Sequence, residues 1–506
     1  MTESSRYILG IDQSTSATKA LLFSVDGKLL DSESLPHRQI YPRPGWVEHD
    51  AGEIFSNVQT AVASLLQRHT DKWDRLAAVS ITNQRETFVV FEQATGEPLY
   101  HAIVWQCRRG EAICRRQIEN GHADLVQQRT GLRIDTYFPA SKMQWLLEEE
   151  PEIRQKLADG RALVGTIDTY LIYRLTGGKV FATEPTNASR TLLFDIHRMA
   201  WDEDLTAIFG IPMVALAEVR HSDARFGETD FNGILPTSLP ICGVMGDSQA
   251  ALFSERCFAP GSAKVTFGTG SSILMNIGGK PRLGNQGIVT TVGWDFNRKT
   301  TYALEGIINF TGATIQWLRD QLELIQSAEE TESLAESVPD TAGVYLVPAF
   351  VGLSAPYWRP DARAGILGLT PAATRAHVVR AALESIAYIV NDVLQLMRRE
   401  AGLQLEMIHA DGGAVRNRFL MQFVADITRL KVRAAQTPEL SALGAVLAGA
   451  LGMGFYTSLE EIEQLPAGFT EYSPQMPPEQ AEVLISGWKL AVNQILSNHI
   501  VETKSN

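Results

Sequence analysis

Two aspartates each follow an apolar run that has the character of a buried strand. Asp12 ends the run that begins at Tyr7, and Asp247 follows the run 241–245 and Gly246. A few carboxylates with several waters are the ligands that Mg²⁺ prefers, and a positioned carboxylate can take the proton of an attacking hydroxyl. The pair indicates metal-assisted phosphoryl transfer if the two strand ends face each other. Taken singly, a strand-end aspartate is more often a turn or capping residue.

Two turns rich in small and hydroxyl-bearing residues could hold phosphate. Residues 14–19 read Ser-Thr-Ser-Ala-Thr-Lys, and residues 268–272 read Gly-Thr-Gly-Ser-Ser. Backbone N–H groups, hydroxyls and a cation close together are what a phosphate requires. Neither turn has the GxxxxGK[ST] pattern of a Walker loop. A third stretch, Asp411-Gly412-Gly413, follows a short apolar run and predicts either an anion site at a helix N-terminus or a structural turn.

Residues 81–86 form a third kind of cluster. They read Ile-Thr-Asn-Gln-Arg-Glu and follow a short apolar run, 77–79. An amide, a cation and a carboxylate together can donate to and accept from the hydroxyls of a polyol. Taken alone, the cluster is explained better as an exposed, ion-paired turn.

Each of the two phosphate-type turns lies between strand-like runs. The runs 7–12 and 20–25 flank the first turn, and the runs 263–267 and 273–277 flank the second. A further hairpin is predicted over residues 89–100. The recurrence near the start of each half of the chain predicts an internal duplication, with two unrelated hairpins as the alternative.

Apolar residues recur at helical spacing in four stretches. These are residues 50–68, 316–324, 376–401 and 414–430. Strands alternating with helices are the pattern of α/β domains. The 506 residues are too many for one ordinary core, and a Pro260-Gly261 break precedes the second hairpin. We therefore predict an N-terminal domain over residues 1–253 and a C-terminal domain over residues 254–506.

Composition excludes several classes of protein. The net charge is −13 with no long Lys/Arg cluster, which argues against nucleic-acid binding. The four cysteines form no CxxC pair, and the first residues lack the pattern of a signal peptide, so we expect a cytoplasmic protein with reduced thiols. The longest apolar segment, residues 442–456, is short and rich in Gly and Ala, which predicts a packed core helix and no membrane span.

The chain resembles the FGGY family of carbohydrate kinases, and within it the glycerol kinase subfamily, from about Tyr7 to Val492. The stretches that carry the resemblance include YPRPGWVEHD (41–50), ITNQRET (81–87), AIVWQCRR (102–109), TNASRT (186–191), GDSQAALF (246–253), ALEG (303–306), GATIQWLRD (312–320) and DGGAVRNRFLMQF (411–423). The resemblance implies an α/β fold of two actin-like, ribonuclease H-like ATPase domains flanking a cleft. That fold agrees with the duplicated hairpins.

The resemblance also implies roles for individual residues. Asp247 is the expected general base, and Asp12 with Asp247 is the expected Mg²⁺ site. The expected nucleotide contacts are Thr15, Ser16, Ala17, Lys19, Thr269, Gly312, Gln316, Gly413 and Asn417. The expected acceptor pocket consists of Arg85, Glu86, Trp105, Tyr137, Asp247, Ser248 and Ser272. The partners implied are ATP, Mg²⁺ and a small polyol, and the chain is expected to form a homo-oligomer of two or four copies.

The expected activity is ATP-dependent phosphorylation of a primary hydroxyl of glycerol, giving sn-glycerol 3-phosphate and ADP. Two positions depart from the subfamily pattern: Ser248 replaces the first Gln of GDQQ, and Ser272 replaces an aromatic residue that packs on the acceptor. Because a serine is smaller and polar, a longer acceptor such as a tetritol or a pentulose is the first alternative. An actin-like ATPase without a small acceptor is the second, and the Arg85, Glu86, Trp105 and Tyr137 set argues against it.

Overall fold

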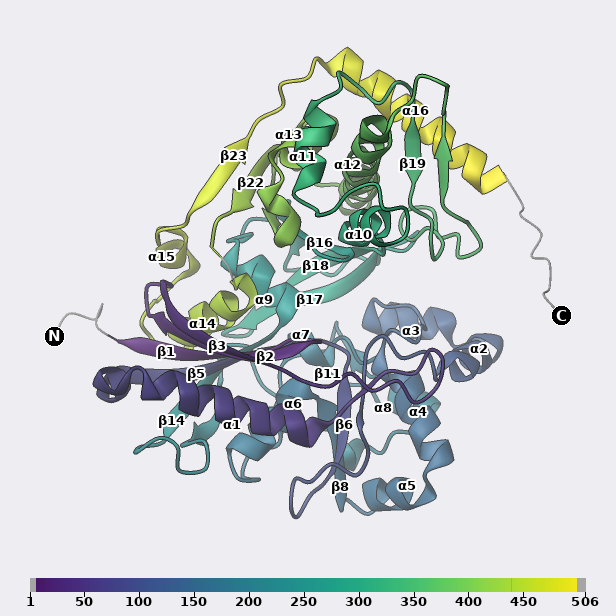
Figure 1. The fold of residues 1–506 in the computed structure, drawn as a ribbon. Coiled ribbons are helices and arrows are strands. Elements are labelled where there is room, and N and C mark those ends of the chain that lie inside the picture. The colour runs from purple at the N-terminus through teal and green to yellow at the C-terminus, as the bar shows by residue number, and fades with distance from the viewer. Residues whose placement is uncertain (1–5, 438, 498–506) are drawn as a thin grey trace.

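The computed structural model describes residues 6–437 and 439–497, which form two lobes (Figure 1). The N-terminal lobe is built on a six-stranded sheet with the order β13-β14-β5-β1-β2-β3. Its strands are β13 (Arg225–Thr229), β14 (Leu239–Gly246), β5 (Leu76–Asn83), β1 (Tyr7–Gln13), β2 (Ala17–Ser24) and β3 (Leu29–Pro36). β1 pairs antiparallel with β2 and parallel with β5, and β5 pairs parallel with β14. Helices α1 (Ala51–Gln67) and α6 (Ile167–Leu175) share a hydrophobic core with this sheet.

The C-terminal lobe is built on a seven-stranded sheet with the order β17-β18-β16-β15-β21-β22-β23. Its strands are β17 (Val289–Phe296), β18 (Lys299–Ile308), β16 (Ser271–Gly278), β15 (Ala263–Phe267), β21 (Met407–Asp411), β22 (Lys431–Ala435) and β23 (Phe469–Tyr472). Its helices include α10 (Gly312–Asp320), α11 (Glu330–Glu336), α12 (Arg375–Ala401), α13 (Arg418–Thr428) and α16 (Pro478–Ser497). Residues of α12 and α13 form the main core of this lobe together with the sheet.

The two lobes repeat one topology. In each, an antiparallel hairpin (β1–β2 or β15–β16) is joined by two parallel strands, β5 and β14 or β21 and β22. A helix follows the last strand of each repeat: α9 (Asp247–Ser254) after β14 and α14 (Leu440–Gly452) after β22. The structure therefore agrees with the predicted internal duplication, and the carboxyl ends of corresponding strands carry the candidate site residues.

A smaller four-stranded sheet, with the order β4-β7-β6-β8, extends the N-terminal lobe. Its strands are β4 (Glu48–His49), β7 (Ala102–Ile103), β6 (Phe88–Glu92) and β8 (Ala162–Thr166). The neighbouring helices are α2 (Glu111–Glu119), α3 (Ala123–Thr130), α4 (Pro139–Glu149), α5 (Pro151–Ala158) and α8 (Glu203–Phe209). Two aromatic residues of the expected acceptor pocket lie here, because Trp105 follows β7 and Tyr137 precedes α4.

Two predicted helices agree with the structure and two differ at their ends. α1 begins where Asp50 accepts hydrogen bonds from the N–H groups of Gly52 and Glu53, and α12 covers the predicted 376–401. The helix predicted over 316–324 is α10, which begins earlier and ends at Asp320. The helix predicted over 414–430 begins only at α13, because the Asn417 side chain caps it by accepting from the Leu420 N–H.

The predicted 89–100 hairpin forms with a short return leg: the Glu92 N–H donates to the Glu97 carbonyl and the Leu99 N–H to the Val90 carbonyl, both at 2.9 Å, around an antiparallel bridge between Phe91 and Pro98. β6 also pairs with β8 over five residue pairs and with β7 at one. The return leg of the hairpin contains Pro98, which has no backbone N–H to donate to a ladder. The sequence pattern therefore located the strand and its hairpin turn, but it did not reveal the longer pairing of β6 with β8.

Helix α14 joins the two lobes. It comes from the second half of the chain, yet it packs on α9 and on strands of the N-terminal sheet. A Cβ atom at Gly444 would overlap the backbone of Ala250 in α9, and one at Gly449 would overlap the Cys242 carbonyl in β14. This close approach explains why the predicted core helix is rich in Gly and Ala. No helix of the described residues is long and apolar enough to cross a membrane.

The predicted boundary between residues 253 and 254 falls in the last turn of α9. The boundary itself stays a prediction. Because α9 and α14 pack on each other between the lobes, we expect the junction to control how the lobes move relative to one another.

The packing of α14 predicts that a Gly→Ala substitution lowers stability, whereas helix propensity predicts that it raises stability. Alanine is favoured over glycine in a helix interior by about 1 kcal/mol, so Gly444→Ala would stabilise an isolated helix. Here we expect it to destabilise the protein by about 1–3 kcal/mol, because the new methyl overlaps the Ala250 backbone. The measurement is the midpoint of urea unfolding. The matched control is Gly279→Ala, whose Cβ would have its nearest contact at 3.6 Å, and a stabilised Gly444→Ala protein would contradict the packing argument.

Candidate active site

The first phosphate-type turn connects β1 and β2. Its backbone is closed by a hydrogen bond from the Ser14 N–H to the Ala17 carbonyl at 2.9 Å, and the Ser14 hydroxyl donates to the same oxygen at 3.0 Å. The Thr15 hydroxyl accepts a hydrogen bond from the Trp105 indole at 3.0 Å. This bond ties the turn to an aromatic residue of the expected acceptor pocket. Ser16 lies exposed at the tip of the turn.

Lys19 lies in β2 directly opposite Asp12 in β1. Its ammonium group donates to both carboxylate oxygens of Glu439, at 2.7 and 2.6 Å. Glu439 precedes α14, so this ion pair also links the first hairpin to the second half of the chain. Lys19 is therefore at the site, with a partner that sequence reasoning did not anticipate.

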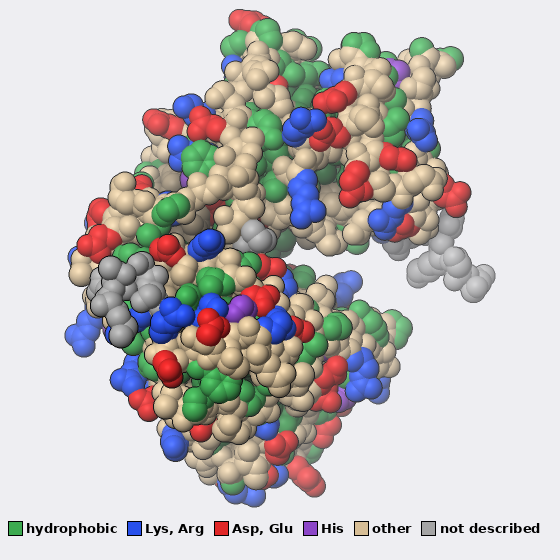
Figure 2. Space-filling view, turned by 60° about the vertical axis from the view of Figure 1, so that its left-hand side comes forward, with side chains coloured by type: hydrophobic (Ala, Val, Ile, Leu, Met, Phe, Trp, Pro, Cys, Tyr) green, Lys and Arg blue, Asp and Glu red, His purple; other side chains and the backbone are tan. Residues whose placement is uncertain are grey.

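Asp12 and Asp247 share a cavity, as the sequence analysis required. Both line one cavity of about 690 Å³, together with Ser248 of the N-terminal half and Asp411 of the C-terminal half. The surface is hollowed between the two lobes (Figure 2). Burial raises the pKa of Asp12 to about 7, with Lys19 opposing the shift and Glu439 and Asp247 adding to it. The carboxylates that line the cavity are Asp12, Asp247, Asp411 and Glu439, and its cations are Lys264, Arg416 and Arg418.

A second cavity, of about 740 Å³, lies in the C-terminal lobe. It is lined by five of the predicted nucleotide residues: Thr269, Gly312, Gln316, Gly413 and Asn417. Gly413, Arg416 and Arg418 line both cavities, so the two spaces adjoin. Gly412 has φ of 94° and a Cβ there would overlap Phe267, which explains the Gly-Gly turn after β21.

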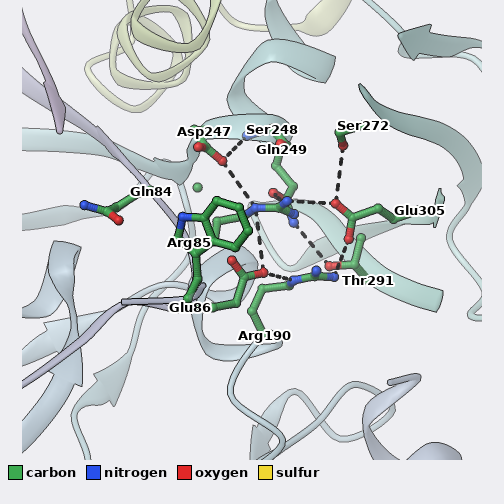
Figure 3. A network of polar contacts seen from close by, with 12 residues as sticks. Gln84, Arg85, Glu86, Arg190, Asp247, Ser248, Gln249, Ser272, Thr291 and Glu305 are labelled. Atoms are coloured by element: carbon green, nitrogen blue, oxygen red, sulfur yellow. Dashed lines mark hydrogen bonds and ion pairs between the residues drawn. The ribbon is translucent and has the colours of Figure 1, made fainter. Parts of the chain in front are cut away.

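Arg85 follows β5 and points toward Asp247 (Figure 3). Its Nε atom lies 3.2 Å from Asp247 Oδ1, and its side chain is almost fully buried. A Cβ at Gly246 would lie 2.8 Å from Arg85 Cγ, so the glycine before Asp247 lets the two side chains meet. The cluster at residues 81–86 is therefore buried, and its interpretation as an exposed turn is wrong.

Glu86 adopts a left-handed backbone conformation, with φ of 62°. A glutamate rarely holds this conformation unless its surroundings determine it, and such residues gather at functional sites. Its carboxylate lies 2.6 Å from Arg190 Nε, and the side chain is 2% exposed. The position of Glu86 is therefore fixed by a buried ion pair.

Trp105 and Tyr137 lie side by side, with ring centroids 5.3 Å apart. Lys142, at the start of α4, holds the two segments together: its buried ammonium donates to the carbonyls of Val104, Trp105 and Tyr137 at 3.2–3.3 Å. Burial lowers the pKa of Lys142 to about 8. The two aromatic rings are thus presented by a locally rigid framework.

The two serines that depart from the subfamily pattern lie in different lobes. Ser248, in the first turn of α9, donates its backbone N–H to Asp247 at 2.6 Å and lines the Asp12 cavity. Ser272, in β16 of the C-terminal lobe, donates its hydroxyl to Glu305 at 3.4 Å. Figure 3 shows that Ser272 and Arg85 contact the same oxygen of Glu305, Oε1.

Sequence reasoning missed three buried charged residues: Lys142, Arg190 and Glu305. Arg190 and Glu305 lie inside stretches that carry the family resemblance, TNASRT and ALEG, but no role was assigned to them. The sequence signal that could have found these residues is a charged residue within a run of small or apolar residues. Such a charge is costly to bury without a partner, which indicates that partners exist but not which ones.

Comparison with known proteins gives relatives over nearly the whole chain. The chain is 47% identical to a glycerol kinase of Symbiobacterium thermophilum over 488 residues, covering 96% of this chain and 98% of the relative. It is 46% identical to glycerol kinase 1 of Thermotoga maritima, covering 97% and 100%. The crystal structure of Plasmodium falciparum glycerol kinase with ADP matches with a TM-score of 0.93 and 36% identity, covering 97% of this chain and 99% of that one.

Family models give the same result for each lobe. The N-terminal domain of the FGGY family of carbohydrate kinases matches residues 7–254, and the C-terminal domain matches residues 263–453. These matches, the duplicated topology and the relatives confirm the resemblance noted in the sequence. The chain belongs to the FGGY family of carbohydrate kinases.

Proposed function

We propose that the chain transfers the terminal phosphoryl group of ATP to a primary hydroxyl of glycerol, giving sn-glycerol 3-phosphate and ADP. The observation that carries the proposal is the contact between Arg85 Nε and Asp247 Oδ1 at 3.2 Å. It puts a hydroxyl-binding group beside a carboxylate that is 37% exposed and lines the inter-lobe cavity. The similarity to glycerol kinases over nearly the full chain supports the choice of acceptor.

The acceptor is bound by groups of two kinds. Arg85 and Glu86 hydrogen-bond its hydroxyls, while the rings of Trp105 and Tyr137 cover its carbon chain. Asp247 accepts the proton of the attacking hydroxyl, and its partial exposure lets it reach a substrate in the cavity. Arg85 places a permanent positive charge 3.2 Å from this carboxylate.

The nucleotide is bound mainly by the C-terminal lobe. Gly312, Gln316, Gly413 and Asn417 line the cavity proposed for its base and ribose. Thr15, Ser16, Ala17 and Lys19 of the first turn and Thr269 of the second are the proposed phosphate contacts. Because the two turns come from different lobes, closing the lobes brings both onto the phosphates and excludes water that would hydrolyse ATP.

Mg²⁺ is the proposed metal, held by Asp12 and Asp247. The fit rests on Asp12, a carboxylate on the cavity wall whose pKa is raised mainly by burial, with Glu439 and Asp247 adding to the shift. Among residues 6–437 and 439–497, no group of three or more His, Cys, Asp or Glu side chains could hold a metal by itself. A few protein carboxylates, with waters and phosphate oxygens as the other ligands, are the usual arrangement for Mg²⁺. When bound, the ion neutralises charge on the transferred phosphoryl group.

Two broader expectations are also proposals. A homo-oligomer of two or four copies and a cytoplasmic location follow from the family resemblance. Size-exclusion chromatography with light scattering would test the first.

Replacing Asp247 tests the proposed base. Asp247→Asn keeps the size of the side chain but cannot accept a proton, so we expect kcat to fall by about 10²-fold or more. The measurement is ADP release in a coupled assay with saturating ATP and glycerol. The control is Asp159→Asn, which removes an exposed carboxylate paired with Arg161 and should leave kcat unchanged. Turnover near the wild-type value in Asp247→Asn would rule out this role.

Replacing Asp12 tests how much stability the burial of its carboxylate costs. The pKa of Asp12 is about 7 in the folded protein and close to 3.8 when unfolded, so its ionised form destabilises the fold increasingly between these pH values and by a constant amount above. We expect Asp12→Asn to raise the thermal midpoint without nucleotide or metal, more at about pH 8 than at about pH 5. The exposed control Asp71→Asn should change stability by less than about 0.5 kcal/mol. A lower midpoint for Asp12→Asn at the higher pH would contradict this account.

Ser272 favours a second candidate acceptor. Its hydroxyl lies beside Glu305, where it can accept or donate a further hydrogen bond to a polyol longer than glycerol. The test is to measure kcat/KM for glycerol, erythritol and xylulose in the wild type and in Ser272→Phe. If the serine admits longer acceptors, the variant should lose activity on erythritol or xylulose and keep activity on glycerol. A wild-type preference for glycerol over both longer substrates would remove this alternative, and equal ADP release with and without any polyol would favour an ATPase.

A further inference from the structure

Four charged side chains alternate in sign around a closed ring at the junction of the lobes (Figure 3). Arg85 Nη2 lies 2.8 Å from Glu305 Oε1, and Arg190 Nη1 lies 2.6 Å from Glu305 Oε2. Arg190 Nε lies 2.6 Å from Glu86 Oε1, and the same oxygen lies 3.9 Å from Arg85 Nε. Each carboxylate therefore bridges the two guanidinium groups.

The ring is buried on all sides. The side chains of Arg190 and Glu305 are 0% exposed, and those of Arg85 and Glu86 are 4% and 2% exposed. Burial alone would raise the pKa of Glu305, but Arg190 and Arg85 hold it at about 2. Removing one member of such a ring leaves an uncompensated charge away from water, which the remaining side chains can relieve only by moving.

The members of the ring come from both lobes. Arg85, Glu86 and Arg190 belong to the N-terminal lobe, whereas Glu305 lies in β18 of the C-terminal lobe, paired with Val289 on one side and Leu274 on the other. A residue in the interior of a sheet has little freedom to follow a moving partner. Glu305 can therefore hold Arg85 only while the two lobes are joined at this point.

Gln249 makes a second connection of the same kind. Its side-chain oxygen accepts from Arg85 Nη1 at 3.2 Å, and its amide donates to the Thr291 hydroxyl and the Val292 carbonyl, both at 3.2 Å. Thr291 and Val292 lie in β17 of the C-terminal lobe. Two neighbouring strands of this lobe thus determine where the Arg85 guanidinium lies.

We propose that Glu305 is a positioning residue for the acceptor: it fixes Arg85 from the C-terminal lobe and so makes acceptor binding depend on the lobes being joined. Glu305 acts through Arg85 and needs no contact with the substrate. This inference rests on the proposed function, which assigns Arg85 to acceptor binding. A merely structural role would lower stability without changing the balance between acceptor and nucleotide binding.

The test is Glu305→Gln, which keeps the shape and one hydrogen-bond acceptor but removes the charge. We expect KM for glycerol to rise at least about tenfold, which corresponds to about 1.4 kcal/mol of lost binding, while KM for ATP changes less than about threefold. The matched control is Glu384→Gln in α12. Glu384 is also buried, with 3% of the residue exposed, and it pairs with Arg380 at 2.8 Å. Glu384 itself lines neither cavity, although its neighbour Leu383 lines the cavity of about 740 Å³. The control should lose stability and keep both KM values.

Each outcome has a distinct meaning. An unchanged KM for glycerol in Glu305→Gln, or an equal rise in Glu384→Gln, would overturn the proposal. Wild-type protein that releases no additional ADP when glycerol is added would instead overturn the proposed function. If Glu305→Gln does not fold, Glu305→Asp keeps the charge but is too short to reach both arginines. Its KM for glycerol should also rise, and a wild-type value would overturn the proposal.

Discussion

The structure of the site depends on one constraint: the charges at the junction of the lobes are cut off from water and must balance one another. Arg85, Arg190, Glu86 and Glu305 meet this constraint as an alternating ring with 0–4% exposed side chains. A buried ion pair of this kind is weak evidence for stability, because apolar residues of similar volume often serve equally well. Its value lies in geometry, since two bridging carboxylates leave each guanidinium one position that satisfies both.

The duplicated topology explains how such a site can be assembled from distant parts of the chain. In both lobes the central strands are parallel, so their carboxyl ends meet at one edge of the sheet. Asp12 near the end of β1, Asp247 after β14 and Asp411 at the end of β21 are carried to the same cavity in this way. The crossing of α9 and α14 then sets how closely the two edges approach.

Much of this arrangement could be read from the sequence, because it depends on local patterns. Alternating and helical periodicity located both hairpins, α1 and α12, and the Gly-Gly turn lies at the wall of the cavity proposed for the nucleotide. The sequence did not reveal which buried charged residues form ion pairs with each other. The pairs Lys19–Glu439 and Arg85–Glu305 join residues 420 and 220 positions apart, and no local pattern carries that information. The start of α13 was missed for a smaller reason, since Asn417 can equally occupy a helix interior or a cap.

Two buried carboxylates of this site respond to burial in opposite ways, and the difference separates their roles. Asp12 is 7% exposed and has its pKa raised to about 7, whereas Glu305 is fully buried and has its pKa held at about 2. The difference comes from the neighbouring charges. Glu305 has two guanidinium groups within 2.8 Å, while the Lys19 ammonium, opposite Asp12, forms its ion pair with Glu439. The charge of Glu305 is therefore paired within the protein, which suits Glu305 to fix another side chain. The pKa of Asp12 is raised mainly by burial, and the proposed divalent cation would stabilise the ionised form of this carboxylate.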